Sequence, residues 1–149
     1  MNTVNDSGQD IEARKSLAFD LLNAAGYLER RLDRALSTIR GVSFTEYRML
    51  RVLAARPDAR AMRVELAEAV GLTPSAVTRA LKPMEKLGLI ETLKSERDAR
   101  RSLACLTSGG QELLSDAEGI VRDVLLGLPI EALGEAGLDA FLRQVGERI

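Results

Sequence analysis

The chain has 149 residues, a formal net charge of −1, 46% hydrophobic residues and 29% charged residues, which is typical of one soluble globular domain. It contains no histidine and one cysteine, which excludes histidine-based catalysis, internal disulfides and thiolate zinc sites. It also lacks a phosphate-binding glycine loop and any apolar run long enough to span a membrane. We therefore expect a cytoplasmic protein that is not an enzyme and uses no metal and no cofactor.

The N-terminal region predicts a short tail followed by one long helix. Residues 1–10 are polar and acidic, which indicates a disordered tail rather than a signal peptide. Residues 11–40 carry an apolar stripe at helical spacing, made of Leu17, Leu21, Ala24, Leu28, Leu32, Ala35 and Ile39. A helix of about 30 residues is roughly 45 Å long, more than a domain of this size needs. We expect a partner chain to cover the stripe; the alternative is that the helix wraps around its own domain.

A second helix is predicted to begin shortly after Gly41, which interrupts the first. Ser43 and Glu46 have the spacing of a capping box, in which each side chain binds the other residue's backbone N–H. We expect the buried face of this helix to consist of Tyr47, Leu50, Leu53 and Ala54.

The segment 63–87 predicts two helices joined by a tight turn. The first covers about 63–70, with Val64, Leu66, Ala67 and Val70 pointing inward. Gly71 suits the left-handed residue that ends a helix, while Thr73 and Pro74 suit the N-cap and first position of the next helix, which runs to about Leu87. This spacing predicts a helix-turn-helix rather than an unspecialised helical hairpin.

The outward face of the second of these helices is predicted to contact DNA. Its polar side chains are hydroxyls and cations, which bind phosphates and base edges. The candidate residues are Thr73, Ser75, Ala76, Thr78, Arg79, Lys82 and Lys86. Pro83 removes one backbone hydrogen bond, and we expect it to bend the helix beyond its N-terminal half.

A basic β-hairpin is predicted to follow. The segments LIETL and SLACL read as two short strands on either side of a charged turn. The turn supplies the candidate DNA-binding residues Arg97, Asp98, Arg100 and Arg101. From Thr73 to Arg101 there are seven cations and four anions in an otherwise acidic chain, and such a patch attracts polyanions. The alternative is that the charged turn is only a solvated loop.

The C-terminal region, residues 107–149, predicts two more helices, with Thr107 as a cap and Pro129 as the break between them. The predicted fold class is therefore mainly α with a small β-hairpin wing. We expect one domain over residues 1–149, with a winged helix-turn-helix lobe at 43–106 and long dimerisation helices at 11–40 and 107–149.

These motifs resemble the MarR family of bacterial transcription regulators over nearly the whole chain. The most specific part is the wing, where Asp98-Ala99-Arg100 precedes a strand and then Leu-Thr, and LTPSAVTRALKPMEKLGLI resembles the family's recognition helix. The resemblance implies that the helix from Pro74 lies in the major groove. It also implies that Asp98 orients Arg100 and that Arg100 enters the minor groove. Pro83 departs from the family pattern.

The resemblance further implies a homodimer, joined through its first and last helices, that represses transcription from a pseudo-palindromic double-stranded DNA operator. A small-molecule effector or an oxidant would change the separation of the two recognition helices. The cleft for the effector would lie among the first, second and fifth helices, whose apolar residues favour an apolar or aromatic compound.

Two other functions and a redox site have less support from the sequence. A winged-helix scaffold that binds only proteins would not need cations at both Arg79 and Arg100. An enzyme that uses carboxylates and a metal would need clustered Asp and Glu residues, and no convincing spacing is present. Cys105 falls in the second wing strand without a histidine to lower its pKa, so we expect no role in redox sensing.

Overall fold

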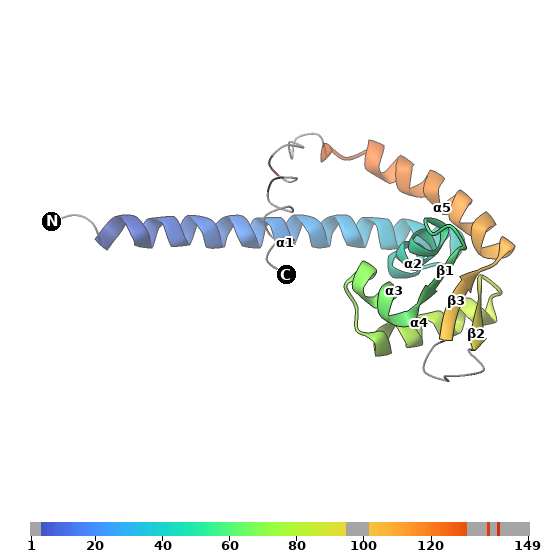
Figure 1. The fold of residues 1–149 in the computed structure, drawn as a ribbon. Coiled ribbons are helices and arrows are strands. Elements are labelled where there is room, and N and C mark those ends of the chain that lie inside the picture. The colour runs from blue at the N-terminus through green and yellow to red at the C-terminus, as the bar shows by residue number, and fades with distance from the viewer. Residues whose placement is uncertain (1–3, 95–101, 131–136, 138–139, 141–149) are drawn as a thin grey trace.

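The computed structural model describes residues 4–94, 102–130, 137 and 140. The elements in chain order are α1 (Val4–Arg40), α2 (Phe44–Ala54), β1 (Arg60–Met62), α3 (Arg63–Val70), α4 (Pro74–Lys86), β2 (Ile90–Lys94), β3 (Ser102–Leu106) and α5 (Ser108–Leu126). Figure 1 shows α1 projecting far beyond a lobe that the shorter elements form around a small sheet. The predicted fold, mainly helical with a β-hairpin wing, is confirmed.

Helix α1 begins earlier than we predicted. We expected residues 1–10 to form a disordered tail, but the helix starts at Val4. Extending an existing helix adds one hydrogen bond for each residue fixed, whereas starting a new one is costly. The polar start of the chain therefore continues the long helix instead of ending it.

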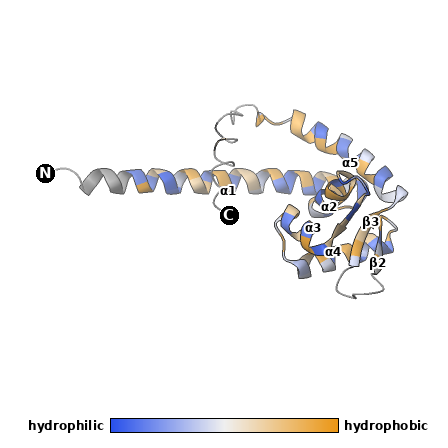
Figure 2. Cartoon of the chain, in the orientation of Figure 1, coloured by the Kyte–Doolittle hydropathy of each residue, from blue (hydrophilic) through white to orange (hydrophobic). Residues whose placement is uncertain are grey.

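Only the C-terminal part of α1 belongs to the core. Leu32 and Leu36 are buried, whereas every side chain from Asp10 to Ala25 is exposed. Figure 2 shows that hydrophobic and hydrophilic residues both occur along this projecting half. The other described elements do not cover it, so the alternative in which α1 wraps around its own domain is not what the structure shows.

Helix α2 is capped as the sequence predicted. The Ser43 hydroxyl accepts a hydrogen bond from the Glu46 N–H, and the Glu46 carboxylate accepts one from the Ser43 N–H at 2.7 Å. Tyr47, Leu50 and Leu53 are buried as expected. A carboxylate on α1 adds a link that we did not predict, because Asp33 accepts a hydrogen bond from the Phe44 N–H at 2.8 Å. This bond ties the start of α2 to the long helix.

The helix-turn-helix is confirmed. Gly71 has φ 69° and ends α3, and the Leu72 N–H donates to the Ala67 carbonyl at 2.9 Å. This pattern satisfies carbonyls that the end of a helix leaves without partners. The predicted inward position of Val64 is wrong, since its side chain is 53% exposed while Leu66 is fully buried. Two residues along a helix turn the side chain by about 200°, so these two point in opposite directions.

The predicted hairpin is present, and it belongs to a three-stranded antiparallel sheet with the strand order β1-β3-β2. In the hairpin, Ile90 pairs with Leu106 and Lys94 pairs with Ser102. Strand β1 was missed because it has only three residues, too few for an alternating pattern to be read. Its Ala61 pairs with Ala104 of the central strand β3.

Helix α5 begins at the predicted cap, because the Thr107 hydroxyl accepts from the Gly110 N–H at 3.1 Å. The last predicted helix, after Pro129, lies almost entirely outside the described residues. No described helix is both long enough and apolar enough to cross a membrane. The core lies between the end of α1, helices α2 to α5 and the sheet.

Candidate nucleic-acid interface

Packing determines which face of α4 points outward. Val77, Leu81 and Met84 are buried, and their spacing of four and three residues places them on one side of the helix. The candidate residues lie on the remaining surface. Thr73, Ser75, Arg79, Lys82 and Lys86 are exposed, while Ala76 and Thr78 are half-buried.

The hydroxyls at the start of α4 have different roles. Thr73 caps the helix by accepting from the Ala76 N–H at 3.2 Å. Thr78 donates its proton to the Pro74 carbonyl at 2.9 Å, so its oxygen remains available mainly as an acceptor. Ser75 is exposed in the first turn, where the positive end of the helix dipole favours phosphate groups.

The cations of α4 are not neutralised by the described part of the chain. None of its carboxylates lies within ion-pair distance of Arg79, Lys82 or Lys86. The one acidic residue of the helix, Glu85, instead accepts a hydrogen bond from the Thr92 N–H at 3.2 Å. This bond joins α4 to strand β2. The face therefore combines three cations with hydroxyl groups, and its only acid serves to position the wing.

The wing strands are described, but the charged turn is not. Lys94 and Ser102 are paired at the end of the hairpin, so residues 95–101 connect two neighbouring strand ends. The predicted residues Arg97, Asp98, Arg100 and Arg101 lie outside the described part of the chain.

Thr107 has a second role that sequence reasoning missed. Besides capping α5, its hydroxyl donates to the Gly88 carbonyl at 2.5 Å, and its N–H donates to the Leu89 carbonyl at 3.2 Å. Gly110 packs against Leu89 so closely that a Cβ there would collide with the carbonyl oxygen. Together these contacts hold the end of α4, the start of the wing and the start of α5 in a single arrangement.

A hollow of about 440 Å³ lies between α2 and α5. Its lining residues are Tyr47, Arg51, Glu118, Val121, Arg122, Leu125, Leu126 and Ile130. The Tyr47 hydroxyl is buried and makes no hydrogen bond with any group that the structure describes. Burial raises the pKa of Tyr47 to about 12, and the neighbouring Glu118 carboxylate adds to the rise while Arg51 opposes it.

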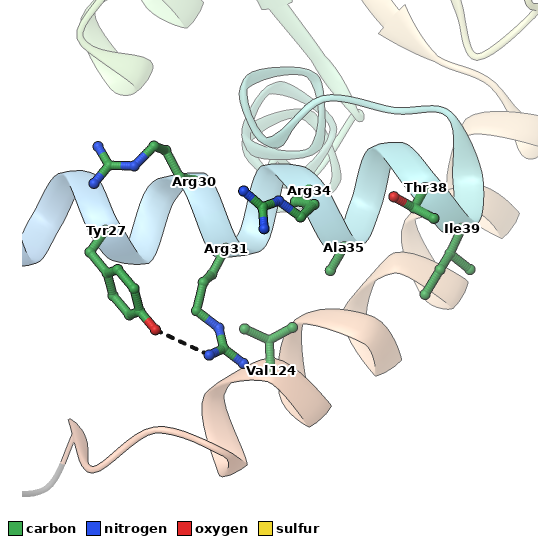
Figure 3. A pocket seen from close by; sticks show the side chains of 8 residues that line it. All are labelled: Tyr27, Arg30, Arg31, Arg34, Ala35, Thr38, Ile39 and Val124. Atoms are coloured by element: carbon green, nitrogen blue, oxygen red, sulfur yellow. Dashed lines mark hydrogen bonds between the residues drawn. The ribbon is translucent and has the colours of Figure 1, made fainter.

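The expected cleft among the first, second and fifth helices is divided in the structure. Helix α1 does not line the hollow between α2 and α5, but it lines a separate one with α5 (Figure 3). Two ion pairs connect these helices: Arg40 with Asp116 at 2.7 Å, and Arg51 with Glu118 at 3.2 Å. Helix α5 therefore contacts both α1 and α2 and borders both hollows.

Cys105 is buried in β3, and burial raises the pKa of its thiol although Arg60 partly opposes the rise. A protonated thiol is a poor nucleophile, and the absence of a redox role remains a prediction. Within the described residues, no group of three Asp, Glu or Cys side chains is placed to hold a metal ion.

Comparisons with known proteins agree on the family. The sequence profile of the MarR family matches residues 40–101. HTH-type transcriptional repressors of Mycobacterium tuberculosis and Mycobacterium bovis are 30% identical over 106 residues, which cover 71% of this chain and 74% of theirs. Sco3205, a MarR family transcriptional regulator from Streptomyces coelicolor crystallised with DNA, is 28% identical with a TM-score of 0.80, covering 89% of this chain and 86% of that one. The regulator BldR from Sulfolobus solfataricus shares the fold at 20% identity, with a TM-score of 0.77 and coverage of 93% and 98%. The chain therefore belongs to the MarR family of winged helix-turn-helix transcription regulators.

Proposed function

We propose that the protein is a bacterial cytoplasmic repressor that binds double-stranded DNA sequence-specifically and has no enzymatic activity. The observation that carries this proposal is the outward face of α4, where Arg79, Lys82 and Lys86 have no ion-pair partner among the described residues. An exposed helix with cations and hydroxyls suits the major groove, which presents a distinct pattern of donors and acceptors for each base pair. The relative from Streptomyces coelicolor was crystallised with DNA.

The proposed contacts divide between the helix and the wing. Helix α4 reads base edges and phosphates through Thr73, Ser75, Ala76, Thr78, Arg79, Lys82 and Lys86. The wing adds Arg97, Asp98, Arg100 and Arg101, with Arg100 in the minor groove and Asp98 holding it in place. An arginine in the minor groove responds to groove width and negative potential more than to sequence.

The active form is proposed to be a homodimer. The exposed large hydrophobic residues of α1 are Ile11, Leu17, Phe19, Leu21, Leu22, Tyr27 and Ile39. Leu17 and Leu21 lie one helical turn apart on the same side of α1, and exposed apolar side chains grouped in this way mark interaction sites. Residues 11–40 and 107–149 would form the dimer, while residues 43–106 bind DNA. A two-fold dimer presents two recognition helices and therefore selects a pseudo-palindromic operator.

The hollow between α2 and α5 is the proposed effector site. Its buried Tyr47 hydroxyl lacks a hydrogen-bond partner among the described groups, and a buried polar group of this kind gains from a ligand that supplies one. Arg51 and Arg122 provide cations, while Val121 and Leu125 provide an apolar wall. A small organic anion with an apolar body fits this lining. It would compete for Arg51 with Glu118 and so shift α5 relative to α2.

Footprinting on the intergenic DNA beside the protein's own gene tests the proposal. The parent protein should protect a pseudo-palindrome, and Arg79→Ala/Lys82→Ala should lose the protection. Arg14→Ala/Lys15→Ala removes the same charge from the exposed N-terminal half of α1. Because that half belongs to the proposed dimer, the variant is first checked by sedimentation, and as a dimer it should retain the protection. If no sequence is protected, or if both double variants behave alike, the reading as a protein-binding scaffold is favoured.

A further inference from the structure

The single carboxylate of α4, Glu85, forms a hydrogen bond that crosses from the helix to the wing. Its Oε1 atom accepts from the Thr92 N–H of β2 at 3.2 Å. Figure 1 shows α4 and the β2–β3 hairpin side by side in the lobe. Thr92 is two residues from Lys94, where β2 ends and the charged turn follows. The bond therefore attaches the wing close to the turn that carries the proposed minor-groove arginine.

Thr92 lies on the open edge of the sheet. The strand order β1-β3-β2 gives β3 a partner on each side, whereas β2 pairs only with β3. Because this pairing uses the backbone groups on one side of β2, the N–H groups on its other side have no strand to bind. The Glu85 carboxylate takes the place of such a strand at Thr92. It thereby fixes the outer side of β2 to α4.

A second attachment lies at the base of the wing. The Thr107 hydroxyl donates to the Gly88 carbonyl, and the Thr107 N–H donates to the Leu89 carbonyl at 3.2 Å. A hairpin that is held at its base alone can still change its twist relative to the helix. Glu85 holds β2 three residues further along the chain than Leu89. The direction of the wing is therefore fixed as well as its starting point.

Local chemistry does not favour an acid at position 85. Glu85 is in the last turn of α4, where the negative end of the helix dipole disfavours a carboxylate. It is also exposed and follows Thr78, a candidate DNA contact, by seven residues, which places both on the same side of the helix. A carboxylate there repels the phosphates of a bound duplex. The hydrogen bond to Thr92 is the favourable interaction that opposes both effects.

We propose that Glu85 is a positioning residue for DNA recognition. It makes no contact with DNA, but it holds the wing at the angle at which α4 and Arg100 enter adjacent grooves of one duplex. The inference rests on the proposed DNA-binding function and adds a residue to it. A wing that is fixed before binding loses less conformational freedom on the DNA, which raises the affinity. Removing this acid therefore weakens binding, the opposite of what its charge alone predicts.

Two substitutions separate the hydrogen bond from the charge. Glu85→Gln removes the charge but keeps an oxygen that accepts from the Thr92 N–H, whereas Glu85→Ala removes both. Glu85→Ala should bind the operator about three- to tenfold more weakly than Glu85→Gln, as expected for the loss of one hydrogen bond. Glu85→Gln should bind at least as tightly as the parent, because a negative charge near the phosphates is lost. Alanine and glutamine both suit a helix, so circular dichroism should show that both variants are folded.

Footprints of the two grooves give a readout that a general loss of stability would not change selectively. Hydroxyl radicals report protection of the minor groove, and methylation of guanine N7 reports protection of the major groove. At saturating protein, Glu85→Ala should lose protection of the minor groove by the wing and keep protection of the major groove by α4. Glu91→Ala removes the same charge from an exposed position on β2 and leaves the Thr92 bond in place, so it should keep both.

Amide hydrogen exchange of the free protein tests the attachment without DNA. The Thr92 amide should exchange faster in Glu85→Ala than in the parent, and Glu85→Gln and Glu91→Ala should keep its protection. Unchanged exchange in Glu85→Ala, equal operator affinities of the two Glu85 variants, or a joint loss of protection in both grooves would each overturn the proposal. If no operator is found but the exchange results hold, Glu85 still positions the wing and only the DNA-binding function fails.

Discussion

At the level of single residues, Arg79 and Arg100 are expected to make different contributions to DNA recognition. Arg79 is exposed on α4, where a bidentate contact with guanine is worth about 1–3 kcal/mol of discrimination. Arg79→Ala should therefore weaken binding to the operator much more than to random DNA. Arg100→Ala should weaken both and flatten the salt dependence, because a cation near the phosphates is lost.

Titrations of operator and random duplexes at several salt concentrations distinguish these two effects. Asp98→Ala should resemble Arg100→Ala if Asp98 positions that side chain. Tighter binding would mean that Asp98 only repels phosphate. Unchanged affinity in both arginine variants would contradict the assigned contacts.

The ionisation of Tyr47 is expected to lower the stability of the folded protein at alkaline pH. Its pKa is about 12 in the folded protein against an ordinary value of 10, so the folded state retains a proton that the unfolded chain loses first. This contribution to stability is fully present below pH 10 and is lost as the pH rises from 10 to 12. The chain has two tyrosines and no tryptophan, so Tyr27→Phe leaves Tyr47 as the only phenol. Its ultraviolet titration should have a midpoint close to 12, coupled to unfolding, and a midpoint near 10 in the folded state would contradict this.

Cys105 is expected to be inert. Its thiol is buried in β3, and burial raises its pKa, so little thiolate is available to react with peroxide. Cys105→Ser should leave the affinity for the operator unchanged and its response to peroxide unaltered in gel-shift titrations. Release of DNA by peroxide from the parent, but not from the variant, would identify Cys105 as a sensor.

At the scale of elements, the turn between α3 and α4 depends on one backbone conformation. A Cβ on Gly71 would meet nothing within 4 Å, but φ is +69°. Gly71→Ala should therefore lower the free energy of unfolding by about 1–2 kcal/mol through backbone strain alone. Gly119 lies within α5, and a Cβ there would also meet nothing within 4 Å. Gly119→Ala should instead raise the stability by up to about 1 kcal/mol, because alanine favours helices.

Thermal unfolding followed by circular dichroism compares the two glycine variants. Opposite shifts of the melting temperature are expected. Equal shifts in the same direction would contradict the backbone strain that we expect in the Gly71→Ala variant.

At the scale of the whole molecule, the projecting half of α1 should determine the oligomeric state. Leu17 and Leu21 are 72% and 41% exposed, and no described core residue lies between Asp10 and Ala25. Leu17→Gln/Leu21→Gln should therefore give a folded monomer that no longer binds the operator. Val64→Gln changes another exposed apolar residue, 53% accessible on α3, and should remain a dimer. A monomeric parent at micromolar concentration in sedimentation experiments would contradict the dimer.

The features that could be predicted from the sequence alone depend on interactions between residues that are close together in the chain. The Ser43–Glu46 capping box, the left-handed Gly71, the Thr73 cap and the polar face of α4 all follow from side chains that act on nearby backbone. The β-hairpin was also predictable, because its two short strands are neighbours in the chain on either side of a charged turn. Local spacing was therefore enough for the fold class and for the candidate residues of α4.

Other features depend on contacts between residues that are distant in the chain, and only the tertiary structure shows them. Strand β1 exists because β3 offers it a partner, and the Thr107 hydroxyl reaches Gly88 only because α5 begins beside the wing. The burial of the Tyr47 hydroxyl depends on where α5 lies relative to α2, since no local pattern specifies that distance. These features come from packing between elements, which periodicity within a single element does not encode.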